Sequence, residues 1–384
     1  MARKLIDSTA GTYSGLEGWA GPFVDGNDNV YIVGAEDSQG YHVYKAGSNP
    51  LVDTWTIQDS SNEPTTIDAA ARGSVWQEGT ELHLISWDNS AEQYEYSVFR
   101  MSDHASADTW GTVDELMEHP TNAPLSPHCY IAVRSDGDLV VAYNGDTDKI
   151  MGTDYERADY AYEEGSGWTV GQTIGGGNGE QDFNAKGIGR GASDETWFLY
   201  EANGDGDIKI RSLSSTNSTS AVLTHDEPGF SSTSPHVGYY DDAGVEVMTN
   251  VWRIATAGYS IQTRDGTLQS ELSLSGTDMD SGTTSTCVAI DGTDAYAVYR
   301  SGTADDVTYQ KSADGGTWGD ITTISTATAP AQISANVIDH GGGNVLAVLY
   351  EDGGDLYYDE ISIVPPASVP PLRRNTLLNH LLRR

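Results

Sequence analysis

Two copies of the tripeptide Ser-Pro-His hold the side chains best suited to chemistry in this chain. Ser126-Pro127-His128 and Ser234-Pro235-His236 each open an apolar segment that alternates like a β-strand. Histidine titrates near neutral pH, so it suits proton transfer as a general base or acid. The structural alternative is that proline begins a strand and the histidine packs or caps a turn. Both interpretations place the two histidines at matching points of a repeated unit.

Asp68, Asp182 and Asn184 occupy similar positions at the starts of other apolar segments. If these segments are the innermost strands of a closed ring, their starts meet around one axis. We therefore expect a polar binding mouth formed by the residues Asp68, His128, Asp182, Asn184 and His236.

Two Asp-rich turns, NGDGD from Asn203 and NGDTD from Asn144, offer oxygen ligands of the kind that Ca²⁺ prefers. Neither matches the 12-residue EF-hand loop, and hairpin turns on an acidic surface have the same composition. The sequence contains no Cys/His zinc spacing, phosphate-cradling glycine loop or nucleophile-elbow serine. We expect no cofactor and leave a structural Ca²⁺ ion open.

A repeated unit must position these residues. Seven times, an apolar segment is followed by a Gly/Asp/Asn turn and an alternating segment, a pattern that predicts a β-hairpin. The copies begin near residues 22, 70, 130, 186, 236, 287 and 336. A third strand follows each hairpin, and a fourth follows in six cases. Four antiparallel strands per unit predict an all-β fold, a seven-bladed β-propeller spanning residues 1–364. The last unit lacks its fourth strand, so we expect residues near Arg3–Ser8 to pair beside Asp355–Ser362 and close the ring.

One turn between a third and a fourth strand carries a recognisable motif. The sequence SADGGTW, with Ser312, Asp314, Gly316 and Trp318, resembles the Asp box of the sialidase-like propellers, although it is one residue shorter. The resemblance implies a structural role, in which Ser and Asp cap the turn and the Trp packs between blades. Sialidases also use three arginines and an early Arg-Ile-Pro motif, which is not found here. The resemblance therefore concerns architecture and carries no activity.

The charge is strongly acidic, with 57 Asp and Glu against 20 Lys and Arg and a net charge of −37. Such a surface repels itself at ordinary ionic strength, whereas molar salt shortens the Debye length to about 3 Å. An acidic excess spread along the whole chain is typical of halophilic proteins. It also argues against a nucleic-acid partner, because phosphate binding needs a basic patch.

Cys129 and Cys287 lie in separate apolar segments, which favours free buried thiols over a disulfide. The N-terminal residues lack the apolar region of a secretory signal, and no segment reaches the roughly 18 apolar residues of a membrane span. We therefore expect synthesis in the cytoplasm of a halophilic host.

The C-terminal residues differ from the rest of the chain. Residues 365–371 are proline-rich and predict a stiff spacer, and residues 372–384 predict a short basic amphipathic helix. A frayed terminus or a helix lying on a membrane surface are the alternatives. If the helix docks on another subunit, its assembly contacts are Leu372, Arg373, Arg374, Leu377, Leu378, Leu381 and Leu382.

These features favour a non-catalytic virion surface protein of a haloarchaeal tailed virus, either a head turret or spike or a tail-associated adhesin. Its partners would be other virion proteins or its own copies, and a host cell-surface glycoprotein or glycan. The alternative is a sialidase-like glycoside hydrolase or polysaccharide lyase acting on surface glycans. A third possibility is a cytoplasmic interaction scaffold with a free tail.

Overall fold

The computed structural model describes residues 3–363 with several gaps. The segments outside the description are 9–20, 37–39, 59–63, 65–72, 89–92, 112–113, 119–127, 145–157, 165–166, 176–182, 192–193, 203–206, 226–229, 234–236, 255–256, 275–278, 280–285, 303, 314–315, 329, 341 and the two ends. Asp68, Asp182, His236, Asp314 and the whole C-terminal segment from residue 364 therefore lie outside the described residues.

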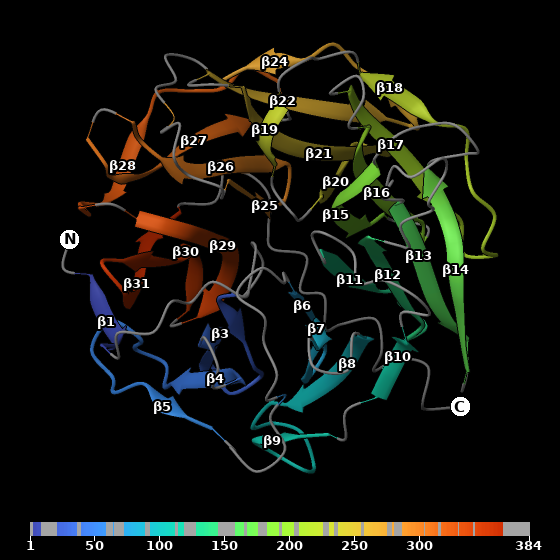
Figure 1. Cartoon of the computed structure of the whole chain (residues 1–384). Helices are drawn as coiled ribbons and strands as arrows, with labels where there is room; N and C mark the ends of the chain where they lie inside the picture. The colour runs from blue at the N-terminus through green and yellow to red at the C-terminus, as the bar shows by residue number, and fades with distance from the viewer. Residues whose placement is uncertain are drawn as a thin grey trace, which may run out of the picture.

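Seven antiparallel sheets are arranged as a ring around a central axis (Figure 1). Blade 1 contains β2 (Phe23–Val24), β3 (Val30–Glu36), β4 (Gly40–Ala46) and β5 (Thr56–Ile57). Blade 2 contains β6 (Ser74–Glu78), β7 (Glu81–Asp88), β8 (Gln93–Arg100), β9 (Thr109–Trp110) and β10 (Asp114–Glu118). Blade 3 contains β11 (Cys129–Val133), β12 (Leu139–Asn144), β13 (Ala158–Glu164) and β14 (Gly167–Gly175).

The remaining blades continue the same order from the axis outward. Blade 4 contains β15 (Phe183–Arg190), β16 (Thr196–Ala202), β17 (Asp207–Leu213) and β18 (Leu223–His225). Blade 5 contains β19 (Phe230–Thr233), β20 (Gly238–Asp242), β21 (Val245–Ile254), β22 (Ala257–Arg264), β23 (Thr267–Leu268) and β24 (Leu272–Ser273). Blade 6 contains β25 (Cys287–Asp291), β26 (Asp294–Arg300), β27 (Val307–Ala313) and β28 (Thr322–Ser325). Blade 7 contains β29 (Pro330–His340), β30 (Gly343–Asp352), β31 (Asp355–Ser362) and β1 (Lys4–Asp7).

The N-terminal strand closes the ring, as the sequence predicted. Strand β1 pairs antiparallel with β31, with Lys4 opposite Tyr358. The Tyr44 hydroxyl of blade 1 donates a hydrogen bond to Asp7 at 2.7 Å, so the closing strand is also fastened to the next blade. Figure 1 shows β1 beside β31 at the outer edge of blade 7. The prediction of a seven-bladed propeller closed by its N-terminal segment is confirmed.

Turn chemistry explains why each inner hairpin folds locally. Residues with a positive φ, such as Gly137 at 94° and Asp28 at 62°, stand in the short connections between paired strands. Glycine and aspartate accept this left-handed conformation more readily than bulky residues do. The apolar residues of the second strands are buried, and neighbouring blades share these side chains in interblade cores.

The innermost strands are also joined laterally around the axis. Strand β11 contacts the inner strands of both neighbouring blades, β6 and β15. The Gln77 amide donates to the Val24 carbonyl at 2.7 Å, which links blades 2 and 1. The Ser74 hydroxyl accepts the Ile131 N–H at 2.9 Å, which links blades 2 and 3. These bonds hold the inner strands in fixed relative positions, which is what a shared site requires. Within the described residues, no helix has the length and apolar character needed to cross a membrane.

Candidate functional site

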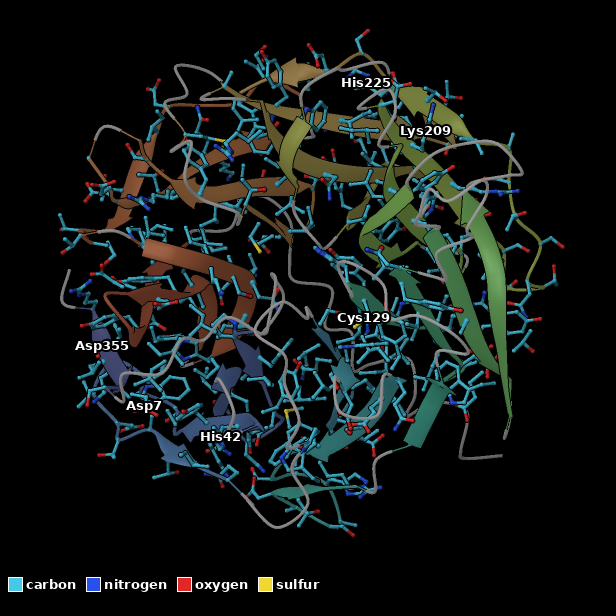
Figure 2. All side chains as sticks on the ribbon, viewed as in Figure 1. Asp7, His42, Cys129, Lys209, His225 and Asp355 are labelled. Atoms are coloured by element: carbon cyan, nitrogen blue, oxygen red, sulfur yellow. The ribbon has the colours of Figure 1, made fainter. Side chains whose placement is uncertain are left out.

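One of the predicted titratable residues lies at the start of an innermost strand. His128 is half-buried and directly precedes β11, the innermost strand of blade 3. Figure 2 shows the next residue, Cys129, near the centre of the ring. His128 therefore stands at the end where the chain enters the inner strand, the location that the sequence predicted for a mouth residue.

Tyr130 holds the imidazole of His128. The His128 Nδ1 atom lies 3.4 Å from the Tyr130 hydroxyl oxygen, a long hydrogen bond within one strand. Residues two apart in a strand share one face, so the alternation of β11 brings the two side chains together. Tyr130 is 1% exposed, whereas His128 is half-buried. His128 is therefore the more accessible of the two side chains, and Tyr130 is buried beside it.

Buried groups beneath the pair fix the backbone of β11. The N–H of Asn144 donates to the His128 carbonyl at 3.0 Å. The Asn144 carbonyl in turn accepts the Tyr94 hydroxyl at 2.8 Å, which ties blade 2 to blade 3 at this point. The Tyr94 ring packs against Trp87 and Tyr143, with ring centroids 4.7 and 5.0 Å away. Such packing leaves little freedom at the base of the site.

The thiol next to His128 is not a nucleophile. Cys129 is fully buried, and burial raises the pKa of its thiol well above the usual range. The thiolate, which is the reactive form, is therefore disfavoured. Burial likewise raises the pKa of Cys287 to about 12. Both cysteines are free and buried, as the sequence predicted.

The structure says less about the positions of the other predicted mouth residues. Asn184 lies in β15, the inner strand of blade 4, where its backbone is opposite Glu201. Asp68, Asp182 and His236 are outside the described residues, so their convergence on the axis stays a prediction. Sequence reasoning missed Tyr130, although its position two residues after His128 was a usable signal because both fall on one strand face.

The Asp-box segment lies between β27 and β28, far along the blade from the axis. Ser312 and Trp318 face each other in an isolated antiparallel bridge. Trp318 is buried, and its indole Nε1 donates to the Ser260 hydroxyl of blade 5 at 2.8 Å. Gly316 donates its N–H to the Ala313 carbonyl at 3.1 Å. The hydrogen bond from Trp318 to Ser260 joins blades 5 and 6, and the other two contacts close the turn within blade 6.

A histidine paired with a carboxylate lies away from the axis. His225 Nε2 is 3.3 Å from the Glu271 carboxylate, and its ring meets Trp252 edge-on with centroids 5.4 Å apart. Figure 2 places His225 and Lys209 at the outer rim of the ring. Among the described residues, no group of three or more His, Cys, Asp or Glu side chains is arranged to hold a metal ion. The loops of the two Asp-rich turns, 145–148 and 203–206, fall outside the description.

Solved structures resemble this chain over nearly its whole length. An ulvan lyase of polysaccharide lyase family PL25 aligns with a TM-score of 0.57 and 10% identity, covering 94% of this chain and 96% of that one. The phage phi92 endosialidase aligns at 0.51 and 10% identity, covering 96% and 70%. The α-L-arabinofuranosidase Arb93A from Fusarium graminearum aligns at 0.51 and 10% identity, covering 94% and 98%. No protein-family model and no curated protein matched the sequence. The chain is thus a seven-bladed propeller that resembles sialidase-like, glycoside hydrolase and lyase propellers.

These comparisons correct one expectation. A non-catalytic virion surface protein is wrong as the favoured function, because the propellers that this chain resembles include several named as glycan-acting enzymes. The expectation depended on finding no catalytic motif in the sequence. A propeller site is assembled from strand ends on separate blades, so it leaves no contiguous motif. The alternative interpretation, a glycan-acting enzyme, fits the comparisons better.

Proposed function

We propose that this chain is a polysaccharide-cleaving enzyme that acts by β-elimination at the axial mouth. The observation that carries the proposal is the half-buried His128, held by Tyr130 at the start of an inner strand. The fold supports it, because a lyase propeller aligns with almost the whole chain. Fold alone does not define an activity, so the proposal depends on the chemistry of this side chain.

β-Elimination needs a general base, and we assign this role to His128. The base removes the proton on the carbon next to a uronate carboxyl group, and the electron pair forms a double bond to the neighbouring carbon. The glycosidic oxygen on that neighbouring carbon leaves with its bonding pair and takes up a proton. A neutral imidazole can accept the first proton and, once charged, can return a proton to the leaving oxygen. Tyr130 is a positioning residue in this scheme because it is buried and its hydroxyl contacts the imidazole of His128.

The charge of the chain gives this activity a distinctive salt dependence. With a net charge of −37, the protein repels a uronate polymer at low ionic strength. Molar salt shortens the Debye length to about 3 Å and so screens this repulsion. We therefore expect cleavage of an anionic polysaccharide to rise with salt concentration.

The test is an assay of the full chain with ulvan in molar KCl, following the ultraviolet absorbance of unsaturated uronate. The expected result is turnover that falls at least about 100-fold in His128→Ala, the usual range for loss of a general base. His225→Ala is the matched control, because His225 pairs with Glu271 at the rim and should leave the rate unchanged. Tyr130→Phe should lower the rate less and shift its pH profile. An inactive wild-type chain, or an unaffected His128→Ala variant, would contradict the proposal.

Glycoside hydrolysis is the second candidate, and the similarity to Arb93A favours it. That reaction uses two carboxyl groups about 5–9 Å apart on either side of the scissile bond. Asp68 and Asp182 are the predicted mouth carboxylates that could supply them. Release of reducing sugar from arabinan with no unsaturated product, abolished by Asp68→Asn or Asp182→Asn, would establish this alternative.

A further inference from the structure

One residue in an inner strand has a backbone conformation that is unusual for its residue type and for a strand. Gln332 has a φ of 49°, in the left-handed region, and it lies inside β29. The other non-glycine residues described with a positive φ all lie in connections between strands: Asp28, Asp108, Asp194, Asn217, Ala243, Asp265 and Asp305. Glutamine has neither the freedom of glycine nor the local hydrogen bonding that lets Asp and Asn adopt this region.

A β-bulge causes the unusual conformation. Ala331 is opposite Glu351 and Ser334 is opposite Leu349, so β29 holds one more residue than β30 across this interval. Bulges redirect side chains, and they are common near active sites. The extra residue falls near the start of the inner strand of blade 7, at the end that corresponds to His128 in blade 3.

The residues that follow Gln332 are fixed on both faces of the strand. The Ser334 hydroxyl donates to the Gly21 carbonyl at 2.6 Å, and the Asn336 amide donates to the Pro22 carbonyl at 3.2 Å. Ile333 is fully buried in the core between blades 6 and 7. The surrounding structure therefore imposes the bulge, and a strained residue persists only where its surroundings determine it in this way.

The amide group of Gln332 has no hydrogen-bond partner within the described part of the chain. The side chain is half-buried. A glycine at this position would remove the backbone strain, yet the sequence has a side chain with one carbonyl acceptor and two N–H donors. An amide of this kind can bond two neighbouring hydroxyl groups of a sugar ring at once.

We infer that Gln332 is a substrate-contacting residue of the axial mouth, which binds hydroxyl groups of the polysaccharide and sets its register relative to His128. The inference depends on the proposed function and deepens it, because it assigns a subsite on blade 7 to the neutral hydroxyls of the sugar. Gln332 takes no part in proton transfer, so its loss should raise KM and leave kcat nearly unchanged.

The test compares Gln332→Gly, Gln332→Glu and the control Ala243→Gly. Ala243 also has a positive φ, at 54°, but lies in the hairpin turn between β20 and β21, so this control relieves strain without touching the mouth. Gln332→Gly should keep its melting temperature within about 3 °C of the wild type, because strain relief offsets the added chain entropy. Its KM for ulvan should rise about 3- to 30-fold, the range expected for one or two lost hydrogen bonds. Gln332→Glu, which keeps the shape but adds charge and removes donors, should weaken binding at least as much.

Retardation of each protein in gels that contain ulvan or arabinan measures binding without turnover. If the wild type neither binds nor cleaves either polymer, the proposed function fails and this inference fails with it. If the wild type is active and Gln332→Gly binds and cleaves equally well, the inference alone is overturned. A Gln332→Gly variant that loses its fold, or whose loss lies in kcat with KM unchanged, also overturns it, because the residue would then be structural or catalytic.

Discussion

The contact between Trp318 and Ser260 offers a quantitative test of how the blades are joined. Both side chains are buried, and the indole of blade 6 donates to the hydroxyl of blade 5 at 2.8 Å. Trp318→Ala removes a large buried ring, which costs about 3–5 kcal/mol. It also leaves the Ser260 hydroxyl without its partner, which costs about 1–3 kcal/mol more. We expect a total loss of about 4–8 kcal/mol in the free energy of unfolding.

A double-mutant cycle separates the hydrogen bond from the packing. Trp318→Phe and Ser260→Ala each orphan the other partner, whereas the double variant removes both polar groups. The double variant should therefore lose about 1–2 kcal/mol less than the sum of the single variants. Trp110 is the matched control, because it is also buried between strands but its Nε1 makes no hydrogen bond to a described residue. Trp110→Phe should consequently lose less stability than Trp318→Phe.

Urea denaturation in 2 M KCl, followed by far-UV circular dichroism, measures these differences as midpoint shifts at constant slope. Additivity of the two single variants within about 0.5 kcal/mol would refute the hydrogen-bond argument. A loss below about 1 kcal/mol in Trp318→Ala would refute the view that this Asp-box tryptophan holds neighbouring blades together.

Three further outcomes are expected. Lowering KCl from molar to about 0.1 M should lower the melting temperature markedly, because the net charge of −37 is then poorly screened, and an unchanged melting curve would refute a halophilic adaptation. The hydrogen bond between His340 and the Glu360 carboxylate raises the pKa of the imidazole above 6.5 in the folded chain, so the stability that this bond contributes is present below pH 6.5 and is lost as pH rises through the folded-state pKa. His340→Gln should therefore flatten the decline of melting temperature with pH in a series from pH 6 to 9, and an unchanged slope would contradict the assignment. A chain ending at residue 364 should keep its melting temperature, and if residues 365–384 associate with other copies, sedimentation should show a smaller particle than the full chain; equal sedimentation would exclude that role.

Much of the fold could be predicted because each blade repeats its local chemistry. Turn residues such as Gly137 and apolar segments like that around Val141 set each hairpin independently of the rest. The missing fourth strand of the last unit predicted that residues near Arg3–Ser8 pair beside Asp355–Ser362, and β1 does pair with β31. In contrast, β29 begins at Pro330, several residues before the hairpin segment recognised in the sequence. No local sequence pattern predicts this extension, because the strand is held there by hydrogen bonds to the carbonyl groups of Gly21 and Pro22.

The candidate site was only partly predictable for the same reason. His128 could be recognised because Ser-Pro-His recurs at matching points of two units. The support from Tyr94 and Asn144 joins separate blades, so no spacing in the sequence reveals it. Gln332 could not be recognised either, because its bulge is imposed by Ser334 and Asn336 reaching the Gly21 and Pro22 carbonyls. Contacts between blades, which give a propeller its site, are the information that a single repeat lacks.

The mass of the products from ulvan tests the central claim most directly. Elimination breaks the glycosidic bond without adding water, so each new unsaturated end is lighter by one water than the corresponding hydrolysis product. We predict unsaturated oligosaccharides from the wild-type chain in molar KCl, and none from His128→Ala. Fully saturated products, or an equal yield of unsaturated products from His128→Ala, would contradict the assignment of this propeller as a lyase that uses His128.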